Sequence, residues 1–400
     1  MPKILQINAT ANWGSTGRIA EQINALARSK GWECFIAYGR YANPSESSLI
    51  RIGSMPTVIA HYIENKILDN EGLASRCATN YLINEIDRLC PDIIHLHNIH
   101  DHWINYKLLF EYLNTTDIPV VWTQHDCWAF TGGCAHYSMN ECYKWQTGCE
   151  ACKYKGNLLD RAHKHYRLRK ELFLSNKNLT IVPVSDWLKS EIEKSFLNSA
   201  NIITIYNGVD LNIFRRSNNK DLLNRYSLKG KYILLCLATS WSHKKGFYDY
   251  IQLAKQLPSD CVVIMVGVTS EQKKHLPENI IGIEKTHDVY ELVDIYSVSD
   301  IVLNLSYEES FGLTTVEGFA CGKPAIVYDK TASPELVSKD TGVIVKAGDI
   351  GGIIDAINII RQSDEESYSN ECRKRAELLY DMSKSYARYV ELYESLIKDR

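Results

Sequence analysis

Short runs of apolar, often β-branched residues recur along the chain, separated by segments in which apolar residues repeat every three to four positions. Such runs are typical of strands buried on both faces of a parallel sheet, and the longer repeat is typical of the helices that cover it. In the first half of the chain we predict strands at 3–8, 34–38, 92–97, 119–124 and 179–185, with helices at 17–30 and 78–90. In the second half we predict strands at 232–238, 261–267, 300–306, 323–329 and 341–346.

Two consecutive series of strands and helices predict an α/β protein with two doubly wound, Rossmann-like domains. We expect the boundary near the polar stretch that follows Asn207-Gly208, so that residues 1–207 form an N-terminal domain and residues 208–379 a C-terminal one. The tail has apolar residues at helical spacing, and we expect a helix at about 380–400 that packs back on the N-terminal domain. Ligands of open α/β sheets bind at the carboxyl ends of the strands, so we expect the active site in a cleft where the two domains face each other.

Composition and charge narrow the class of protein. The 45% hydrophobic and 23% charged residues are the fractions of a soluble globular protein, and the net charge of −3 argues against a nucleic-acid binder. The chain passes from its first residues directly into a strand, and we find neither a signal peptide nor an apolar stretch of about 18 residues. We therefore expect a cytoplasmic protein whose twelve cysteines are reduced.

The most informative motif is EESFGLTTVEGFACGKP at residues 308–324. Glu309 and Glu317 lie on either side of a predicted helix N-terminus, where backbone N–H groups favour a phosphate. Carboxylates accept hydrogen bonds from paired hydroxyls of a ribose or a pyranose, so the motif predicts a nucleotide-sugar pocket. A helix start that favours acidic residues would explain Glu309 alone, but it would not explain Glu317.

Two further loops follow the first predicted strand of each domain. Lys245 could neutralise the charge of a leaving diphosphate, although a solvated basic loop is the commoner explanation for such a sequence. Gly14 and Gly17 precede the first helix, and there a plain tight turn is as good an interpretation as a ligand contact.

These motifs resemble those of the family 4 glycosyltransferases, which are retaining enzymes of the GT-B fold. The resemblance covers nearly the whole chain and rests on Gly14-x-x-Gly17, Asn207-Gly208-Val209-Asp210, Lys245-Gly246 and Glu309-x₇-Glu317, which occur in the same order. The stretches PDIIHLHNIH and QHDCWAFTGGC resemble the branch that assembles bacterial capsule, exopolysaccharide and O-antigen.

The resemblance implies a role for each matching position. Glu309 would hold hydroxyls of the donor sugar, Lys245 would neutralise the diphosphate and His125 would orient the sugar, which makes these three the catalytic residues. The other donor-binding residues would be Gly14, Gly17, Lys244, Phe311, Gly312, Leu313, Thr314 and Glu317. The family often has an arginine five positions before the lysine, but this chain has Ser240 there. Either Lys244 supplies a second cation or one lysine acts alone.

The implied reaction moves a sugar from a UDP- or GDP-linked donor to a hydroxyl of a lipid-linked saccharide with retention of configuration, and it requires no cofactor. A nucleotide-sugar epimerase of the same fold is one alternative, because it would use the same donor without an acceptor. A second alternative, from a different class, is a non-enzymatic adaptor built on a zinc clip.

Histidines cluster after two predicted strands. His95 and His97 share one face of a strand, and we expect core hydrogen bonding or substrate contact there rather than zinc. His100 and His102 lie beyond the end of that strand and Asp126 beyond the next one, so we expect these three on the acceptor side.

Four cysteines follow in a polar loop, at Cys134, Cys142, Cys149 and Cys152. The last two form a Cys-x₂-Cys pair, which suits a tetrahedral metal, and a structural zinc would stiffen a loop without a core of its own. Unligated thiols or a regulated disulfide remain the alternatives.

A basic segment comes directly after these cysteines. Its cations are Lys153, Lys155, Arg161, Lys164, Arg167, Arg169, Lys170 and Lys177, against the acids Asp160 and Glu171. Such a segment is usually a solvated helix, but its interleaved apolar residues also suit an anionic lipid surface. The protein could then be peripheral on the inner face of the plasma membrane.

Overall fold

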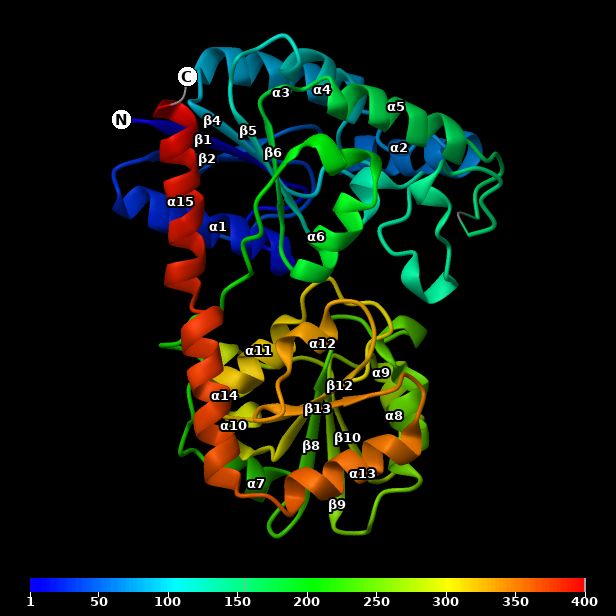
Figure 1. The fold of residues 1–400 in the computed structure, drawn as a ribbon, viewed down its shortest axis with the longest axis vertical. Coiled ribbons are helices and arrows are strands. Elements are labelled where there is room, and N and C mark those ends of the chain that lie inside the picture. The colour runs from blue at the N-terminus through cyan, green and yellow to red at the C-terminus, as the bar shows by residue number, and fades with distance from the viewer. Residues whose placement is uncertain (155, 399–400) are drawn as a thin grey trace. The chain divides into compact units, whose positions relative to one another are not determined.

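The computed structural model describes residues 1–154 and 156–398 (Figure 1). Lys155 of the basic segment and residues 399–400 of the expected C-terminal helix lie outside the described residues. The chain divides into two compact units, a first unit of Met1–Ile205 with Tyr386–Arg400 and a second unit of Tyr206–Ser385. None of the described helices combines the length and the apolar character that crossing a membrane requires.

The first unit is built on a parallel sheet of seven strands in the order β3-β2-β1-β4-β5-β6-β7. Its strands are β1 (Lys3–Ile7), β2 (Glu33–Tyr38), β3 (Ser48–Arg51), β4 (Ile93–Leu96), β5 (Val120–Gln124), β6 (Leu179–Pro183) and β7 (Asn201–Ile202). The five predicted strands are confirmed. The edge strands β3 and β7 escape prediction because they are short and largely exposed, so they carry no continuous apolar run.

Helices cover this sheet. They are α1 (Gly14–Ser29), α2 (Met55–Leu68), α3 (Arg76–Leu89), α4 (Tyr106–Leu113), α5 (Ala162–Leu174) and α6 (Asp186–Glu193). The final helix, α15 (Met382–Lys398), begins in the second unit and continues into the first. There the Tyr393 hydroxyl lies 2.6 Å from His95 Nδ1, and the Tyr389 hydroxyl lies 2.9 Å from Thr123 Oγ1. Because these tyrosines are buried, α15 is part of the core of the first unit.

The second unit is built on a parallel sheet of six strands in the order β10-β9-β8-β11-β12-β13. Its strands are β8 (Tyr232–Leu237), β9 (Cys261–Val266), β10 (Ile280–Ile283), β11 (Ile301–Asn304), β12 (Ala325–Tyr328) and β13 (Gly342–Val345). The five predicted strands are again confirmed, and the missed edge strand β10 contains Gly282, which interrupts its apolar pattern.

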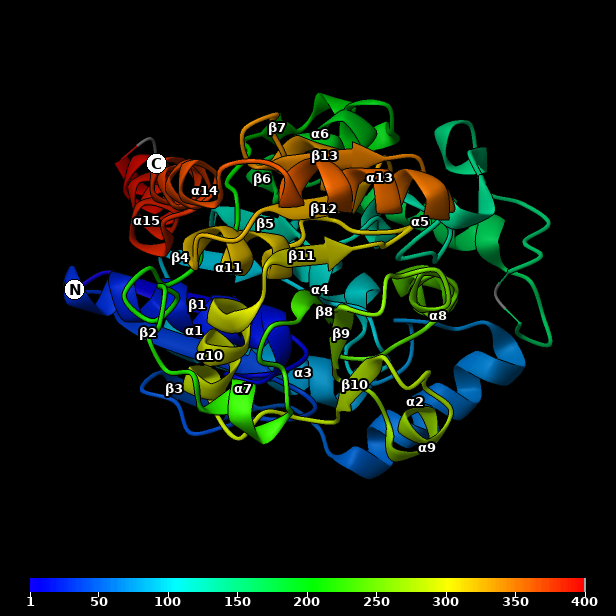
Figure 2. The ribbon, with the colours of Figure 1, turned by 90° about the horizontal axis from the view of Figure 1, so that it is seen from below.

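The second sheet is also covered on both faces. Its helices are α7 (Asp221–Arg225), α8 (Phe247–Ala254), α9 (Ser270–Lys274), α10 (Val289–Val298), α11 (Leu313–Ala320), α12 (Ser333–Leu336), α13 (Ile350–Arg361) and α14 (Glu365–Leu379). Figure 2 shows α8 and α13 on one face and α10 and α11 on the other. Both units are therefore doubly wound α/β domains, as the apolar pattern predicts.

The strand order reverses between β1 and β4 in the first sheet and between β8 and β11 in the second. Ligands of doubly wound proteins bind at such a switch point, beyond the carboxyl ends of the strands. In the second unit, the loops that follow β8 and β11 carry Lys245 and Glu309. In the first unit, the loops that follow β4 and β5 carry His97 and His125.

Candidate active site

An ion pair joins the two loops at the switch point of the second unit. Lys245 Nζ lies 2.6 Å from Glu309 Oε2, and the neighbouring Lys244 Nζ lies 3.1 Å from Glu308 Oε2. The backbone N–H of Tyr307 donates to the carbonyl of Lys244 at 2.8 Å, which fastens one loop to the other. Two positions that are 64 residues apart in the chain therefore form one charged site.

The close approach of these loops depends on Gly246. Its backbone is in the left-handed region, with φ of 72°, and an added Cβ would collide with the carbonyl of Leu305. No other residue fits there without moving the loop, since a side chain would meet backbone instead of a flexible neighbour. Glycine at this position is thus a requirement for the Lys245–Glu309 pair.

The N-terminus of α11 completes this site. Gly312 caps the helix with φ of 103°, so Leu313 and Thr314 begin its first turn and direct their N–H groups out of it. The Glu309 N–H donates to Thr331 Oγ1 at 2.9 Å, which holds the carboxylate beside the helix end. Phe311 is buried, with its ring 5.8 Å from that of Tyr380, so this residue offers a ligand only its backbone.

Glu317 lies one turn deeper in α11 and is half-buried. The hydroxyl of Tyr296 is 2.8 Å from Glu317 Oε2 and 3.0 Å from the carbonyl of Thr314. Burial and the neighbouring Glu317 carboxylate raise the pKa of Tyr296 well above its usual value, so the tyrosine remains a hydrogen-bond donor. Sequence reasoning missed Tyr296, because an amphipathic helix gives no sign of which apolar residue also holds a carboxylate.

In the first unit, a chain of hydrogen bonds determines which ring nitrogen of His97 carries a proton. The Gln6 amide faces the carbonyl of Ala20 at 2.7 Å, and since a carbonyl only accepts, this atom is Nε2. Gln6 Oε1 therefore faces His97 Nε2 at 2.6 Å, and that nitrogen must donate. Burial, with the charges of His95 and His125, lowers the pKa of His97 well below its usual value, so the ring is neutral and Nδ1 bears a lone pair.

The proton position on His97 decides that on His125. His97 Nδ1 lies 3.0 Å from His125 Nε2, so His125 must donate through Nε2. Burial lowers the pKa of His125 to about 4, and this outweighs the opposing effect of Asp126. His125 is therefore a neutral imidazole that presents the Nδ1 lone pair as an acceptor for a ligand hydroxyl.

His100 has the opposite charge state. Its Nε2 lies 2.9 Å from Asp126 Oδ2 and its Nδ1 lies 3.2 Å from Asp101 Oδ1. Burial alone would lower the pKa of His100, but the two carboxylates raise it well above its usual value. The other oxygen of Asp126 accepts from the Trp128 N–H at 2.8 Å. This hydrogen bond fixes the orientation of the carboxylate in its ion pair with His100.

The structure does not bring His102 into this group. Asp101 and His102 both have a left-handed backbone, with φ of 73° and 66°, which turns His102 away from the strand. Its Nε2 lies 2.9 Å from Asn65 Nδ2, on α2. His95 is fully buried between Thr123 Oγ1 at 2.8 Å and the Tyr393 hydroxyl, which is the predicted core hydrogen bonding.

The remaining predicted donor residues of the first unit lie where α1 begins. Gly14 opens the helix at an uncrowded position. Gly17 is buried one turn later, where its Cα packs against Thr10, and its carbonyl accepts from the Asn12 N–H at 3.1 Å. The contacts of Gly17 are therefore those of a packing residue.

The four loop cysteines line one cavity of about 260 Å³, although the chain separates the first and last by 18 positions. In the described part of the chain, no group of three His, Cys, Asp or Glu side chains is already arranged to hold a metal ion. Zinc in this loop therefore stays a prediction.

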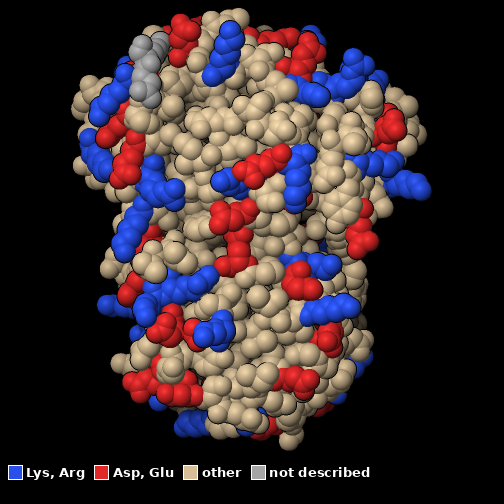
Figure 3. All heavy atoms as spheres, in the orientation of Figure 1, with Lys and Arg blue, Asp and Glu red and all other residues tan. Residues whose placement is uncertain are grey.

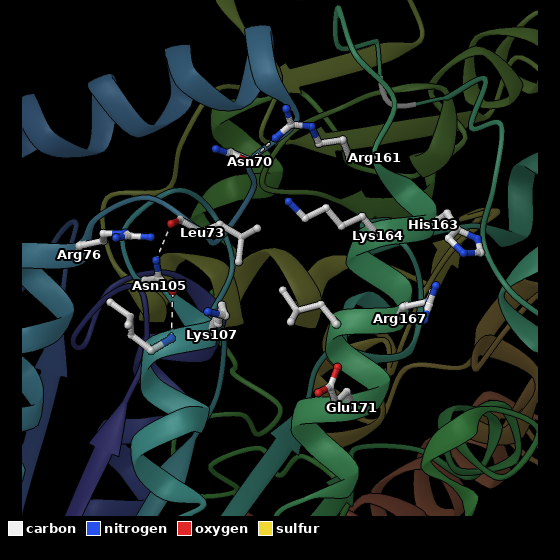
Figure 4. A pocket seen from close by; sticks show the side chains of 12 residues that line it. Asn70, Leu73, Arg76, Asn105, Lys107, Arg161, His163, Lys164, Arg167 and Glu171 are labelled. Atoms are coloured by element: carbon white, nitrogen blue, oxygen red, sulfur yellow. Dashed lines mark hydrogen bonds between the residues drawn. The ribbon is translucent and has the colours of Figure 1, made fainter.

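An open groove of about 690 Å³ lies at the N-terminal ends of α3, α4 and α5 (Figure 4). Its cations are Arg76, Lys107, Arg161, Lys164 and Arg167, against the single carboxylate of Glu171 among the described lining residues. Figure 4 shows Arg161, directly before α5, and Lys164, in its first turn, reaching toward Asn70 and Leu73. The prediction that Arg169 belongs to this basic surface is wrong, because Arg169 is fully buried beneath Trp128.

Models of known protein families match both halves of the chain. Residues 14–213 match the model of Glycosyltransferase Family 4, and residues 219–378 match the model of Glycosyl transferases group 1. The chain is 14% identical to Anabaena Alr3699/HepE, solved in complex with UDP and glucose, with a TM-score of 0.69 over 99% of this chain and 100% of that one. That likeness shows a shared fold, the GT-B fold.

Three curated relatives are similar in sequence. A putative colanic acid biosynthesis glycosyl transferase, WcaC of Escherichia coli, is 22% identical over 98% of this chain and 100% of its own length. An N-acetyl-alpha-D-glucosaminyl L-malate synthase of Bacillus anthracis is 26% identical over 55% of this chain, and the match spans 60% of that protein. An N,N'-diacetylbacillosaminyl-diphospho-undecaprenol alpha-1,3-N-acetylgalactosaminyltransferase of Campylobacter jejuni is 25% identical over 47% of this chain and 51% of its own length.

The two opposite histidine states can be measured by NMR of protein labelled with ¹⁵N-histidine. At pH 7 we expect His125 to be neutral with its proton on Nε2, and to gain a second proton only near pH 4, because burial disfavours its charge. We expect His100 to be a cation at the same pH, because Asp126 and Asp101 stabilise it.

The variant His125→Asn assigns the first signal, and Asp126→Asn should lower the pKa of His100 by removing one of its two carboxylates. A proton on Nδ1 of His125 at pH 7, or an unchanged His100 in Asp126→Asn, would contradict the hydrogen-bond chain derived above.

Proposed function

The chain belongs to the family 4 and group 1 glycosyltransferases, and on that premise we propose that it is a retaining hexosyltransferase. It moves a sugar from a UDP- or GDP-linked donor to a hydroxyl of a lipid-linked saccharide in the assembly of a bacterial surface polysaccharide. The observation that carries this proposal is the Lys245–Glu309 pair beside the N-terminus of α11.

The pair supplies both parts of donor recognition. Lys245 is about one-third exposed and Glu309 about one-fifth, so both heads can reach a ligand. When the donor binds, the Lys245 ammonium exchanges Glu309 for the diphosphate oxygens, and the Glu309 carboxylate then accepts from the sugar hydroxyls. The N–H groups of Leu313 and Thr314 bind the phosphate, and Lys244 contributes the second cation that the missing arginine would supply at Ser240.

Glu317 accepts from the two ribose hydroxyls of the nucleotide. The Tyr296 hydroxyl holds one carboxylate oxygen at 2.8 Å and so sets the rotamer of Glu317. The carboxylate is therefore already oriented before the ribose binds, so binding costs less conformational entropy.

The acceptor and the donor sugar meet the residues of the first unit. His125 accepts a hydrogen bond from a sugar hydroxyl through Nδ1, the nitrogen that Gln6 and His97 leave unprotonated. The His100–Asp126 ion pair holds the neighbouring loop in place for the acceptor. Gly14 leaves room for the donor phosphate at the start of α1.

The chemical step exchanges one bond at the anomeric carbon. The bond from this carbon to the diphosphate breaks, a bond to the acceptor oxygen forms on the same face, and the acceptor proton passes to the leaving diphosphate. The lysines stabilise the charge that develops on the diphosphate, and positioning provides the rest of the rate enhancement. Neither glutamate forms a covalent intermediate, because both bind hydroxyls.

The relatives support the proposed substrates. The Anabaena structure holds UDP and glucose, and the Campylobacter enzyme is named for a diphospho-undecaprenol-linked sugar. The Escherichia coli relative is named for colanic acid biosynthesis. These names favour a transferase over an epimerase, which would need no acceptor.

A surface of the first unit suits an acceptor that is held in a membrane. Helix α2 exposes an apolar stripe of Ile59, Tyr62, Ile63 and Ile67, each about half exposed. The Leu158 N–H donates to the carbonyl of Lys66 at 3.0 Å, which adds the exposed Leu158 to the end of the stripe.

The basic groove adjoins this stripe, since the Arg161 N–H donates to Asp69 Oδ2 at 2.6 Å, directly after α2. Apolar residues flanked by cations match the interface of an anionic bilayer. On the face seen in Figure 3, charges of both signs are interspersed. We propose peripheral attachment to the inner leaflet through this surface.

Transferase activity is tested by the release of UDP or GDP from UDP- and GDP-sugars, with and without a polyprenyl diphosphate saccharide. Glu309→Ala and Lys245→Ala should each lower the rate at least about 100-fold, because the first removes the group that positions the donor sugar and the second removes the cation that stabilises the leaving diphosphate. The exposed pair Glu271 and Lys274, 2.9 Å apart on α9, gives the controls Glu271→Ala and Lys274→Ala, which should keep the rate.

A product that forms without release of UDP or GDP would exclude the transferase and favour the epimerase. A product with inverted configuration, read from its NMR coupling constants, would exclude retention. Unfolding of Glu309→Ala or Lys245→Ala, seen by circular dichroism, would assign the ion pair to stability instead of chemistry.

Membrane attachment is tested by sedimentation with vesicles of phosphatidylglycerol and phosphatidylcholine. Lys164→Ala/Arg167→Ala should weaken binding to the anionic vesicles by roughly 20- to 30-fold, since each basic residue near the surface contributes about 1 kcal/mol. Lys170→Ala/Lys177→Ala removes the same charge outside the groove and should have a smaller effect. Equal binding to neutral and anionic vesicles would contradict this attachment.

A further inference from the structure

The loop between Thr131 and Asp160 holds four sulfur atoms around one cavity. Cys134, Cys142, Cys149 and Cys152 all line it. Among the described residues of this loop, regular structure is limited to two 3-10 turns, η2 (Ser138–Asn140) and η3 (Lys144–Gln146). The buried rings of Tyr137 and Trp145 pack against each other and anchor the loop, whereas the four cysteines all lie in irregular backbone.

The sulfurs interact with one another. Cys134 shares a hydrogen bond with Cys152, and Cys149 and Cys142 lie close to it. The structure describes all twelve cysteines, and each is a thiol instead of half of a disulfide. Thiolates at these positions would repel one another unless a cation lay between them.

A sulfur of the cluster already receives the kind of hydrogen bond that metal thiolates receive. The Gly132 N–H donates to Cys149 Sγ at 3.1 Å. An N–H group that points at a sulfur stabilises a negative charge on it.

Arg169 is a buried cation next to this cluster. Its guanidinium lies 3.7 Å from the ring centroid of Trp128 and donates to the carbonyls of Trp128 and Thr131. Its Nε and Nη2 have no hydrogen-bond acceptor in the part of the chain that the structure describes. Arg169 forms no ion pair with an acidic side chain among residues 1–154 and 156–398. A buried charge without a counter-charge costs several kcal/mol, so an anionic centre beside Arg169 would stabilise it.

We propose that Cys134, Cys142, Cys149 and Cys152 bind one structural Zn²⁺ as four thiolates, with Arg169 as the buried counter-charge. Four thiolates and Zn²⁺ make a centre with a net charge of −2, and binding releases the four thiol protons. A disulfide would be neutral and would leave Arg169 without an anion, which is why the cluster favours a metal.

Metal binding requires a local adjustment. No three possible ligands in the described residues already enclose a metal position, so the sulfurs must move inward until each is about 2.3 Å from the ion. The loop can make this movement because its backbone is mostly irregular. Zinc then adds stability to that which the packing of Tyr137 and Trp145 already provides.

The test is the metal content of the full chain, purified without chelator or affinity metal and measured by elemental analysis. We expect one zinc per chain. Cys149→Ser/Cys152→Ser should contain less than a tenth of that amount. The matched control Cys77→Ser/Cys90→Ser replaces two exposed cysteines of the same unit and should keep one zinc per chain.

A second measurement holds even if the cysteine variant fails to fold. A mercurial reagent added to the wild-type chain should release one zinc in step with the modification of four thiols beyond the exposed Cys77 and Cys90, and a colorimetric zinc indicator detects the release. Less than a tenth of a zinc per chain would overturn the proposal, and so would iron with inorganic sulfide. Neither readout uses sugar transfer, so the result is independent of the proposed enzyme activity.

Discussion

Parallel strands that are joined by helices all end at the same edge of their sheet, and this constraint brings together the candidate active-site side chains within each unit. Lys245 and Glu309 are 64 residues apart, yet β8 and β11 are neighbours and deliver them to one point. His97 and His125 meet for the same reason, because each follows one of the adjacent strands β4 and β5. The chemistry of each unit therefore follows from strand order more than from any single loop.

Local environment then gives neighbouring side chains different charges. His100 and His125 belong to the same group of histidines, but carboxylates raise the pKa of the first while burial lowers that of the second to about 4. A cation that binds a carboxylate and a neutral ring that offers a lone pair can perform different tasks at one pH. Arg169 is a further buried cation in this unit, and it lies against the Trp128 ring and donates to two backbone carbonyls.

The pattern of apolar residues predicted those strands whose side chains are almost completely buried. The central strands of both sheets carry uninterrupted apolar runs and were predictable, whereas β3, β7 and β10 lie at sheet edges, where exposure or glycine breaks the run. Helix α2 shows little apolar periodicity, because its buried residues include the polar His61 and Asn65 while five of its large apolar residues are exposed. Arg169 was misplaced because the partners that bury it, Trp128 and Tyr106, come from other segments of the chain.

The sequence by itself determined the two doubly wound domains, the Glu309-x₇-Glu317 element and the residue types at each strand end. These are local properties, since hydrophobic period and motif spacing are written along the chain. Only the tertiary structure decided that Tyr296 holds Glu317, that Gln6 sets the proton on His125 through His97, and that His102 turns toward α2. Such contacts join positions that are distant in sequence, and a hydrogen bond is settled by distance and direction in space.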